Sequence, residues 1–296
     1  MPRPLAPLPA ALATRPFTVA QARGLGISRE RLRHPDLLKP TRGVRVPTAD
    51  CSVRAEARVI ASATTSPFAF SHLSAAYLLD LPLPWPWHPS MPWHLMRPTS
   101  LPIPRRTGVV GHRGLESRAR VEVAGLPVVG PLDTWADVAG LLPIDELVVV
   151  GDVLARRGTS PGDLLGYLDG RPGRRGIRAL REAASLTRIG SASRMETLTR
   201  LMFARGGLPE PELNADVHDD AGFWLLRADF LWRRYRVIGE YHGDIHRSSR
   251  RVWQDGFARR RLAEASGWRV VELTSREVFH PQAREELLGL LRAWLV

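Results

Sequence analysis

Two stretches decide the fold of the C-terminal part of this chain: Ala228-Asp229-Phe230 and Gly239-Glu240-Tyr241-His242-Gly243-Asp244-Ile245-His246. The segment from Leu225 to Phe230 is rich in apolar residues and predicts a strand, and Arg236 to Tyr241 predicts a second short strand. Each of the two strands carries one acidic residue, and histidines and arginines follow. The stretch therefore predicts an α/β domain whose sheet presents a polar site.

The two acidic residues are expected to face each other. A chain reversal centred on Arg234-Tyr235 would place Asp229 opposite Glu240, with Cβ atoms about 4.5–5.5 Å apart. Because side chains alternate along a strand, Ile238, Glu240 and His242 would share one face. Asp229, Glu240 and His242 would then form one patch of candidate ligands and bases.

The chemistry of this patch points to a cation. Two carboxylates this close repel each other, and oxygen ligands with open positions suit Mg²⁺ or Mn²⁺. Such an ion lowers the pKa of a bound water and stabilises charge on a phosphoryl oxygen. His242 or His246 could orient or deprotonate that water, since histidine titrates near neutrality. The pattern predicts a metal-dependent nuclease.

Simpler explanations compete for several residues. A lone acidic pair on strands most often faces solvent, and Asp255 with Arg259 at i,i+4 on a helix is usually a surface ion pair, although both could support the site. Ser193 and Glu196 have the capping-box spacing before an apolar helix face, a role that needs no chemistry. The combination favours a functional patch and leaves both roles open for Glu196.

The C-terminal segment 190–296 resembles the Vsr-like endonuclease branch of the PD-(D/E)XK nuclease superfamily. The family outline is a helix with Glu, a strand with Asp, a strand reading E-Y-D-G-x-x-H, a helix with D-x-x-x-R and a strand reading G-W-x-V. This chain supplies, in the same order, Ser193-Arg194-Met195-Glu196, Asp229, Glu240 to His246, Asp255 with Arg259, and Gly267-Trp268-Arg269-Val270.

The resemblance implies roles for single residues. Asp229 and Glu240 would be metal ligands. His246 would be a catalytic or phosphate-contacting histidine, and Glu196 a secondary acidic member of the site. The chain departs from the family in two ways: His242 stands where the family usually has Asp, and the superfamily's catalytic lysine is absent. His242 is compatible with activity and also with a degenerate site.

Composition points to a polyanionic partner. The chain has 296 residues and a formal net charge of +12 at pH 7, and such a basic excess favours nucleic acid. Its basic residues are nearly all arginine, a bias to which a GC-rich genome also contributes. A solvated basic face is the alternative to phosphate contact. The candidate DNA contacts are Arg29, Arg31, Arg33, Arg247, Arg250, Arg251 and Arg259.

The remaining composition indicates a cytoplasmic protein. Cys51 alone can form no intrachain disulfide and no thiolate zinc cluster, which fits a reducing compartment. The N-terminus lacks the pattern of a secretory signal, and no apolar run approaches the about 20 residues of a membrane span. We expect no membrane partner.

The N-terminal segment is the second informative region. Phe17 to Arg23 predicts a helix capped by Thr18. After a Gly-containing turn, Arg29 to Arg33 predicts a second helix capped by Ser28, which together make a helix-turn-helix pattern. Leu37 to Val46 predicts a small β wing. The segment resembles the winged-helix start of AbiEi-type abortive-infection antitoxins. A docking helix pair without a DNA role is the alternative.

The middle of the chain is less informative. It resembles the middle part of AbiEi-like proteins through weak motifs and shows no catalytic constellation. His72 and His112 are expected to be packing or turn residues. The Gly/Arg-rich stretch from Leu168 to Gly176 predicts a linker that leads into the last domain.

We therefore expect an α/β protein with a winged-helix-like DNA-binding domain (1–49), an AbiEi-like α/β middle domain (50–167), a linker and helix (168–189), and a restriction-endonuclease-like domain with a central mixed sheet flanked by helices (190–296). The leading function is Mg²⁺- or Mn²⁺-dependent hydrolysis of double-stranded DNA, in repair, defence or a toxin–antitoxin system. The main alternative is a non-catalytic DNA-binding regulator of the AbiEi antitoxin type, with a toxin partner and a degenerate nuclease fold. An RNA nuclease or RNA-binding protein is a third class. The target, the number of metal ions and the oligomeric state stay open.

Overall fold

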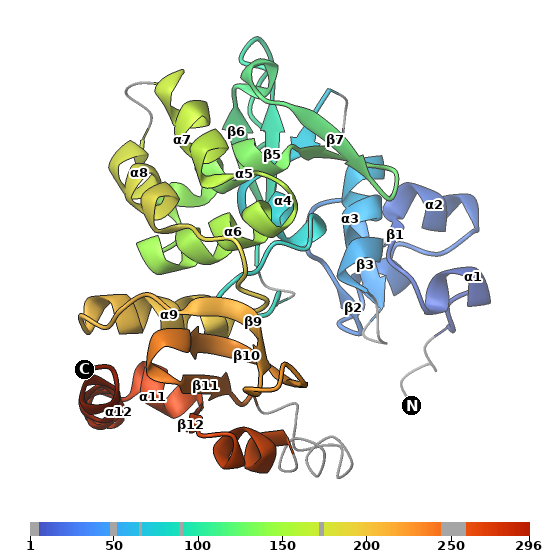
Figure 1. Cartoon of the computed structure of the whole chain (residues 1–296). Coiled ribbons are helices and arrows are strands. Elements are labelled where there is room, and N and C mark those ends of the chain that lie inside the picture. The colour runs from blue at the N-terminus through green and yellow to red at the C-terminus, as the bar shows by residue number, and fades with distance from the viewer. Residues whose placement is uncertain (1–5, 48–51, 65–66, 89–90, 172–174, 244–258) are drawn as a thin grey trace. The chain divides into compact units, whose positions relative to one another are not determined.

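The structure is a computed structural model, and it describes residues 6–47, 52–64, 67–88, 91–171, 175–243 and 259–296 (Figure 1). The chain divides into two compact units, the N-terminal unit (Met1–Leu141) and the C-terminal unit (Leu142–Val296). Both units combine helices with β-sheet, as expected for an α/β protein. The division lies inside the segment 50–167 that the sequence assigned to one middle domain.

The N-terminal unit opens with a small three-stranded sheet of order β1-β3-β2. The hydroxyl of Thr18 accepts a hydrogen bond from Gln21 N at 3.1 Å, and the Gln21 side chain accepts one from Thr18 N at 2.8 Å, so the predicted cap is confirmed. The predicted β pair within 37–46 is also present, because β2 and β3 pair antiparallel. The elements are α1 (Ala10–Ala13), β1 (Phe17–Thr18), α2 (Val19–Gly24), the 3-10 helix η1 (Arg31–Arg33), β2 (Leu37–Leu38) and β3 (Val44–Pro47).

The second predicted helix is wrong in its extent. In place of an α-helix from Arg29 to Arg33 the chain forms a single 3-10 turn, η1. Ser28 still accepts a hydrogen bond from Arg31 N at 3.1 Å. His34 then precedes a proline, which disfavours the α conformation, and its ψ of 144° is extended. The described residues 6–47 therefore hold no recognition helix of the length that a helix-turn-helix needs.

A five-stranded sheet of order β6-β5-β4-β8-β7 forms the rest of the N-terminal unit. Its core is apolar and includes Phe70, Trp93 and Leu95, all fully buried. The indole of Trp93 donates to Glu56 Oε1 at 2.9 Å, and burial raises the pKa of this carboxyl. The elements are α3 (Val53–Ser62), β4 (Ala69–Phe70), α4 (His72–Leu78), β5 (Trp93–Arg97), β6 (Val109–Arg113), η2 (Leu115–Ser117), β7 (Arg120–Val123), β8 (Leu126–Val129), α5 (Pro131–Asp137) and η3 (Val138–Gly140).

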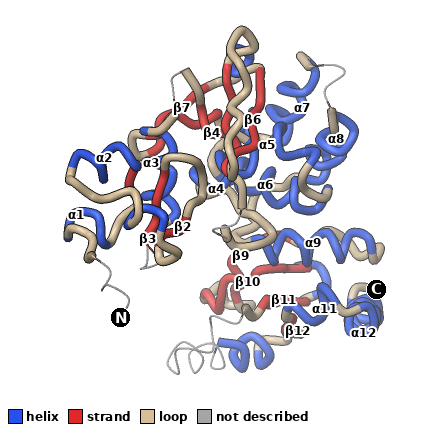
Figure 2. The backbone as a smooth tube through the Cα atoms, turned by 180° about the vertical axis from the view of Figure 1, so that it is seen from behind, coloured by secondary structure: helices blue, strands red, loops and turns tan. Residues whose placement is uncertain are grey.

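The C-terminal unit is built on a four-stranded sheet of order β12-β11-β10-β9. The strands β11 and β12 are parallel and the other pairs are antiparallel, so the sheet is mixed. Figures 1 and 2 show α9, α11 and α12 around it. The elements are α6 (Ile144–Arg156), α7 (Pro161–Asp169), α8 (Ile177–Leu186), α9 (Arg194–Arg205), β9 (Glu212–His218), β10 (Trp224–Trp232), η4 (Arg233–Tyr235), β11 (Val237–Tyr241), a helical segment over 259–265, β12 (Arg269–Leu273), α11 (Ser275–Phe279) and α12 (Pro281–Trp294).

Side chains cover both faces of this mixed sheet. On one face Phe230 packs with Phe203 of α9 and Leu288 of α12. On the other face Ile238 packs with Ala263, which lies in the helical segment 259–265. Alternation along the strands explains the division, because successive side chains point to opposite faces. The site described below continues the second face.

A buried charge pair joins α6 to α9. Arg200 Nη2 lies 3.0 Å from Asp152 Oδ2, and the two side chains are 3% and 1% exposed, so water screens this pair little. Thr197 Oγ1 also donates to Asp152 Oδ2 at 2.8 Å, and Arg188 N donates to Asp152 Oδ1 at 2.7 Å. The buried carboxylate is thus satisfied from three directions.

Two apolar segments in the middle of the chain adopt different structures. The buried segment from Leu147 to Val150 lies within the helix α6. The apolar run from Val121 to Val129 is an antiparallel pair, β7 with β8. No helix in the described ranges has the length and apolar character required to cross a bilayer.

Candidate functional site

A row of four polar side chains crosses the C-terminal sheet at one level. Glu240 on β11 pairs with Glu272 on the parallel strand β12. The β10–β11 register, continued by one residue, places Asp229 opposite Glu240. The β9–β10 register places Asn214 opposite Asp229. The row therefore reads Asn214, Asp229, Glu240 and Glu272, one residue from each strand.

The predicted hairpin has the predicted register. The chain reverses through η4, which contains Arg234 and Tyr235, and the last ladder pair before the site is Phe230 with Gly239. Directly opposed residues on one face of an antiparallel pair have Cβ atoms about 4.5–5.5 Å apart. Asp229 and Glu240 thus lie opposite each other on neighbouring strands, as the sequence indicated.

Glu240 is the most perturbed group of the row. Its Oε1 is buried and has no hydrogen-bond partner among the described residues. Burial, together with the negative charges of Asp229, Glu196 and Glu272, raises the pKa of Glu240 to about 8. Without a neutralising cation this carboxyl is therefore mostly protonated at pH 7. A buried carboxyl surrounded by like charges has the electrostatics of a candidate cation ligand.

Asp229 is held from the backbone of the neighbouring strand. Tyr241 N donates to Asp229 Oδ2 at 2.8 Å. The Tyr241 side chain packs against apolar residues that include Phe230 and Leu198. A residue anchored in the core therefore fixes the position of this carboxylate.

Ser193 and Glu196 form only the first half of the predicted capping box, and the role of Glu196 in catalysis stays a prediction. Ser193 Oγ accepts a hydrogen bond from Glu196 N at 3.1 Å, so Ser193 caps α9. The Glu196 carboxylate accepts hydrogen bonds from Ala192 N and from Asn214 Nδ2, both at 2.7 Å. The second bond ties Glu196 to the end of the polar row, and its charge is among those that raise the pKa of Glu240.

Glu272 joins the row to two cationic groups. Arg260 Nη1 lies 2.6 Å from Glu272 Oε1, and His242 Nε2 lies 3.5 Å from the same oxygen. His242 is exposed and directly follows β11. The sequence singled out His242 but missed Glu272 and Asn214. Alternation along the Gly-Trp-x-Val strand was a usable signal for Glu272, which lies two residues beyond Val270.

Several predicted site residues cannot be placed. His246, Arg247, Arg250, Arg251 and Asp255 lie outside the described residues. Arg259 is described: it is exposed at the start of the helical segment 259–265, and its guanidinium lies 5.7 Å from the centroid of the Trp224 ring.

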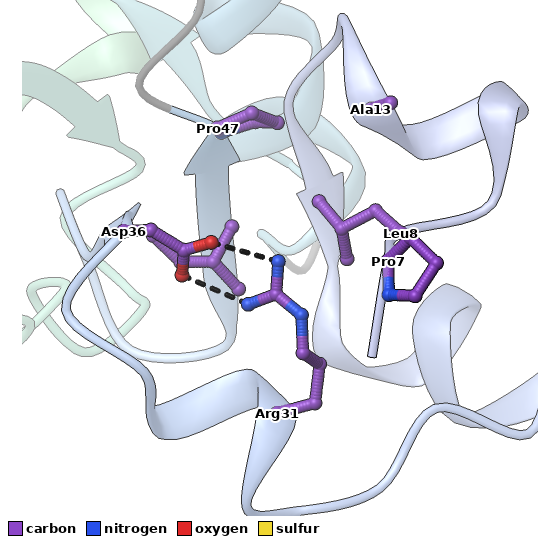
Figure 3. Close-up of a pocket in the computed structure, with 7 residues that line it drawn as sticks. Pro7, Leu8, Ala13, Arg31, Asp36 and Pro47 are labelled. Atoms are coloured by element: carbon purple, nitrogen blue, oxygen red, sulfur yellow. Dashed lines mark hydrogen bonds and ion pairs between the residues drawn. The ribbon is translucent and has the colours of Figure 1, made fainter. Parts of the chain in front are cut away.

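The N-terminal arginines separate into two groups. Arg29 and Arg33 are exposed, whereas Arg31 is only 8% exposed. Arg31 forms two hydrogen bonds of 2.8 Å to the Asp36 carboxylate (Figure 3). Its Nε also donates to Ala6 O at 2.7 Å. This pairing lowers the pKa of Asp36. The prediction of Arg31 as a DNA contact is corrected: its guanidinium is engaged inside the protein, beside a pocket of about 300 Å³ lined by Pro7, Leu8, Ala13, Leu37 and Pro47.

The donor set of the polar row fits a hard divalent cation. Its members offer carboxylate and amide oxygens, which Mg²⁺ and Mn²⁺ prefer. The buried Glu240 Oε1, which has no hydrogen-bond partner in the part of the chain that the structure describes, is a donor of the same kind. The residues that would hold a cation are Asp229 and Glu240, with Glu272 beside them on β12.

Two curated proteins of Mycobacterium tuberculosis are similar to this chain: "Uncharacterized protein MT2308" of strain CDC 1551 / Oshkosh and "Uncharacterized protein Rv2248" of strain H37Rv. Each is 28% identical over 185 residues, which cover 62% of this chain and 65% of the relative. The chain therefore spans slightly less than two thirds of the length of these curated relatives. No family model and no solved structure matches it.

Proposed function

We propose that the protein is a metal-dependent nuclease that hydrolyses phosphodiester bonds of double-stranded DNA. One observation carries the proposal: the buried Glu240 Oε1, which has no hydrogen-bond partner among the described residues, lies beside three further carboxylates on a strongly basic chain. The resemblance of the segment 190–296 to Vsr-like endonucleases supports the same reading.

Three members of the polar row, Asp229, Glu240 and Glu272, are carboxylates, and we call them the acidic row. The acidic row needs a neutralising charge. A proton on Glu240 satisfies the row at neutral pH, but a divalent cation satisfies several carboxylates at once. Asp229 and Glu240 would be its ligands. When bound, the cation would supply stabilisation of the charge that develops on a phosphoryl oxygen.

His242 is the candidate proton acceptor. Its Nε2 faces Glu272 Oε1 at 3.5 Å, which favours the tautomer with the proton on Nε2. The other ring nitrogen, Nδ1, is then free to take a proton from an attacking water. Glu272 stabilises the charged ring that results, in the way that a carboxylate orients a catalytic histidine.

Electrostatics favours a nucleic acid as the substrate. The net charge of +12 favours a polyanion, and exposed arginines such as Arg29, Arg33 and Arg259 can contact phosphates. To cut the backbone, the carboxylates of the acidic row must come close to a phosphate, which is also negatively charged. A cation between the two resolves that conflict.

The test is cleavage of supercoiled plasmid with Mg²⁺ or Mn²⁺ by the full chain. Asp229→Asn and Glu240→Gln should bind DNA like the wild type but cut on the order of 100-fold or more slowly. Glu286→Gln, on the exposed side of α12, is the matched control and should cut normally.

Two results would redirect the proposal. If the wild type binds DNA, cuts no member of a wide panel and shows no calorimetric binding of Mg²⁺ or Mn²⁺, the protein is a non-catalytic DNA-binding regulator. If it cuts single-stranded or structured RNA and leaves DNA intact, the substrate assignment is wrong and the catalytic one stands.

A further inference from the structure

Three histidines from separate elements meet in the N-terminal unit. They are His72 at the start of α4, His94 on β5 and His112 on β6. One ring nitrogen from each lies within 4.8 Å of the others. His94 is buried, and His72 and His112 are half-buried. The cluster lies in the N-terminal unit, whereas the acidic row lies in the C-terminal unit.

The sheet topology brings these side chains together. In the parallel pair β5–β6, Met96 lies opposite His112 and His94 opposite Val110, so His94 and His112 are diagonal neighbours on one face. The strand β4 pairs with β5, and Ser71 N donates to His94 O at 3.0 Å just before α4 begins. His72 is thus delivered beside His94 by the turn from β4 into α4.

The distances suit a shared ion. His94 Nδ1 lies 3.0 Å from His112 Nε2. Two nitrogens bound to one tetrahedral zinc ion lie roughly 3.3 Å apart, because each Zn–N bond is about 2.0–2.1 Å. The His72 ring stacks on that of His112 with centroids 3.6 Å apart. An ion would replace the His94–His112 hydrogen bond, and the His72 ring would turn toward it.

The electrostatic environment favours neutral imidazoles, which are the metal-binding form. Burial and the neighbouring His112 lower the pKa of His94 to about 4. Burial also lowers the pKa of His112, while the charge of Asp137 acts in the opposite direction. Three neutral nitrogen donors suit Zn²⁺, Co²⁺, Ni²⁺ or Cu²⁺ and do not suit Mg²⁺ or Ca²⁺.

The surrounding groups hold the histidines in place. His72 Nδ1 lies 3.1 Å from Ser71 Oγ, and His94 N donates to Ser74 Oγ at 2.8 Å. His72 also has a φ of 50°, a left-handed conformation that is uncommon outside glycine and recurs at functional sites.

We propose that His72, His94 and His112 bind one zinc-class transition-metal ion, with a fourth position open to water or a small ligand. Three protein ligands plus one exchangeable position is the arrangement that zinc adopts at reactive sites. The sequence predicted packing or turn roles for His72 and His112. It did not single out His94, because the sequence around a buried strand residue does not show which side chains lie beside it in space.

The test uses the full chain without a polyhistidine tag, stripped with a chelator and titrated with Zn²⁺ by calorimetry and with Co²⁺ by absorption spectroscopy. His72→Asn keeps a residue that tolerates positive φ, and His112→Gln removes the second imidazole. His88→Ala is the matched control, because His88 is an exposed histidine of the same unit.

The wild type should bind one Zn²⁺ and give the intense visible bands of tetrahedral Co²⁺. Both ligand variants should bind at least 10-fold more weakly and lose the bands, and His88→Ala and Glu240→Gln should retain them. Circular dichroism checks that the variants are folded. Absence of binding by the wild type, or unchanged binding by folded His72→Asn and His112→Gln, would overturn the proposal.

Discussion

Asn214 Nδ2 donates to Glu196 Oε2 at 2.7 Å, so a single amide joins β9 to the first turn of α9 beside the acidic row. The same amide donates to Gly190 O at 2.8 Å. Asn214 has a φ of 47°, which asparagine tolerates better than most residues. Its position in the row and its backbone conformation both depend on this residue type.

Asn214→Gly isolates the role of that amide. Glycine adopts positive φ without strain, so the substitution removes the hydrogen bonds and leaves the backbone intact. We expect a loss of about 1–2 kcal/mol in the free energy of unfolding and a roughly tenfold fall in cleavage rate, because Glu196 keeps only one of its two partners. Denaturant titration and plasmid nicking measure the two effects. Asn214→Ala should be less stable than Asn214→Gly, and the reverse order would show that the amide and not the backbone sets the residue type.

Glu240 makes stability depend on pH. Its folded-state pKa of about 8 is raised above the unfolded value of about 4.5, so the folded state holds a proton that the unfolded state has lost between these two pH values. The contribution is fully present below pH 4.5 and is lost as pH rises through 8. In chelator, Glu240→Gln should therefore melt several degrees above wild type at pH 8.5, with a smaller difference at pH 5. A difference in melting temperature that is constant between pH 5 and 8.5 would mean that Glu240 ionises normally.

Divalent cations should remove the loss of folding stability that ionisation of Glu240 causes at alkaline pH. A bound Mg²⁺ or Mn²⁺ favours ionised Glu240, and a ligand at 100 times its dissociation constant stabilises the folded state by about 2.7 kcal/mol. For a unit of this size the expected rise in melting temperature is roughly 5–10 °C at pH 8. Asp229→Asn and Glu240→Gln should show little of this rise. Equal shifts in wild type and both variants would place the cation elsewhere.

Arg31 and its neighbours should separate into structural and DNA-contacting residues. Arg31→Ala leaves Asp36 with His34 in place of its bidentate guanidinium partner and should destabilise the N-terminal unit by roughly 1–3 kcal/mol. Arg29→Ala and Arg33→Ala should leave the melting temperature unchanged. Each should weaken DNA binding and reduce the salt dependence of the binding constant by about 0.9 in logarithmic slope, as expected for one lost phosphate contact. Salt titrations by fluorescence anisotropy measure this slope. Unchanged slopes for both variants would remove the N-terminal segment from the DNA interface.

Local patterns in the sequence predicted the features that depend on residues close together along the chain. The pairing of Asp229 with Glu240 follows from strand alternation and a short reversal, both of which lie within one hairpin. Glu272 was missed because its parallel pairing with Glu240 joins strands that are distant in the sequence. The burial of Arg31 was missed because basic composition does not distinguish a free guanidinium from one paired with Asp36. The cluster of His72, His94 and His112 brings together side chains from three separate elements, so no local pattern in the sequence predicts it.

The buried pair of Asp152 and Arg200 has a consequence for Glu196, which lies in the first turn of α9. Arg200 lies one helical turn after Glu196, so the pair fixes the rotation of α9 about its own axis as well as its distance from α6. A rotation that brought Arg200 out of register would swing the Glu196 carboxylate away from Asn214. Residues of α6 are therefore expected to tune the geometry of the acidic row without contacting it. Relatives that change Asp152 should change Arg200 with it.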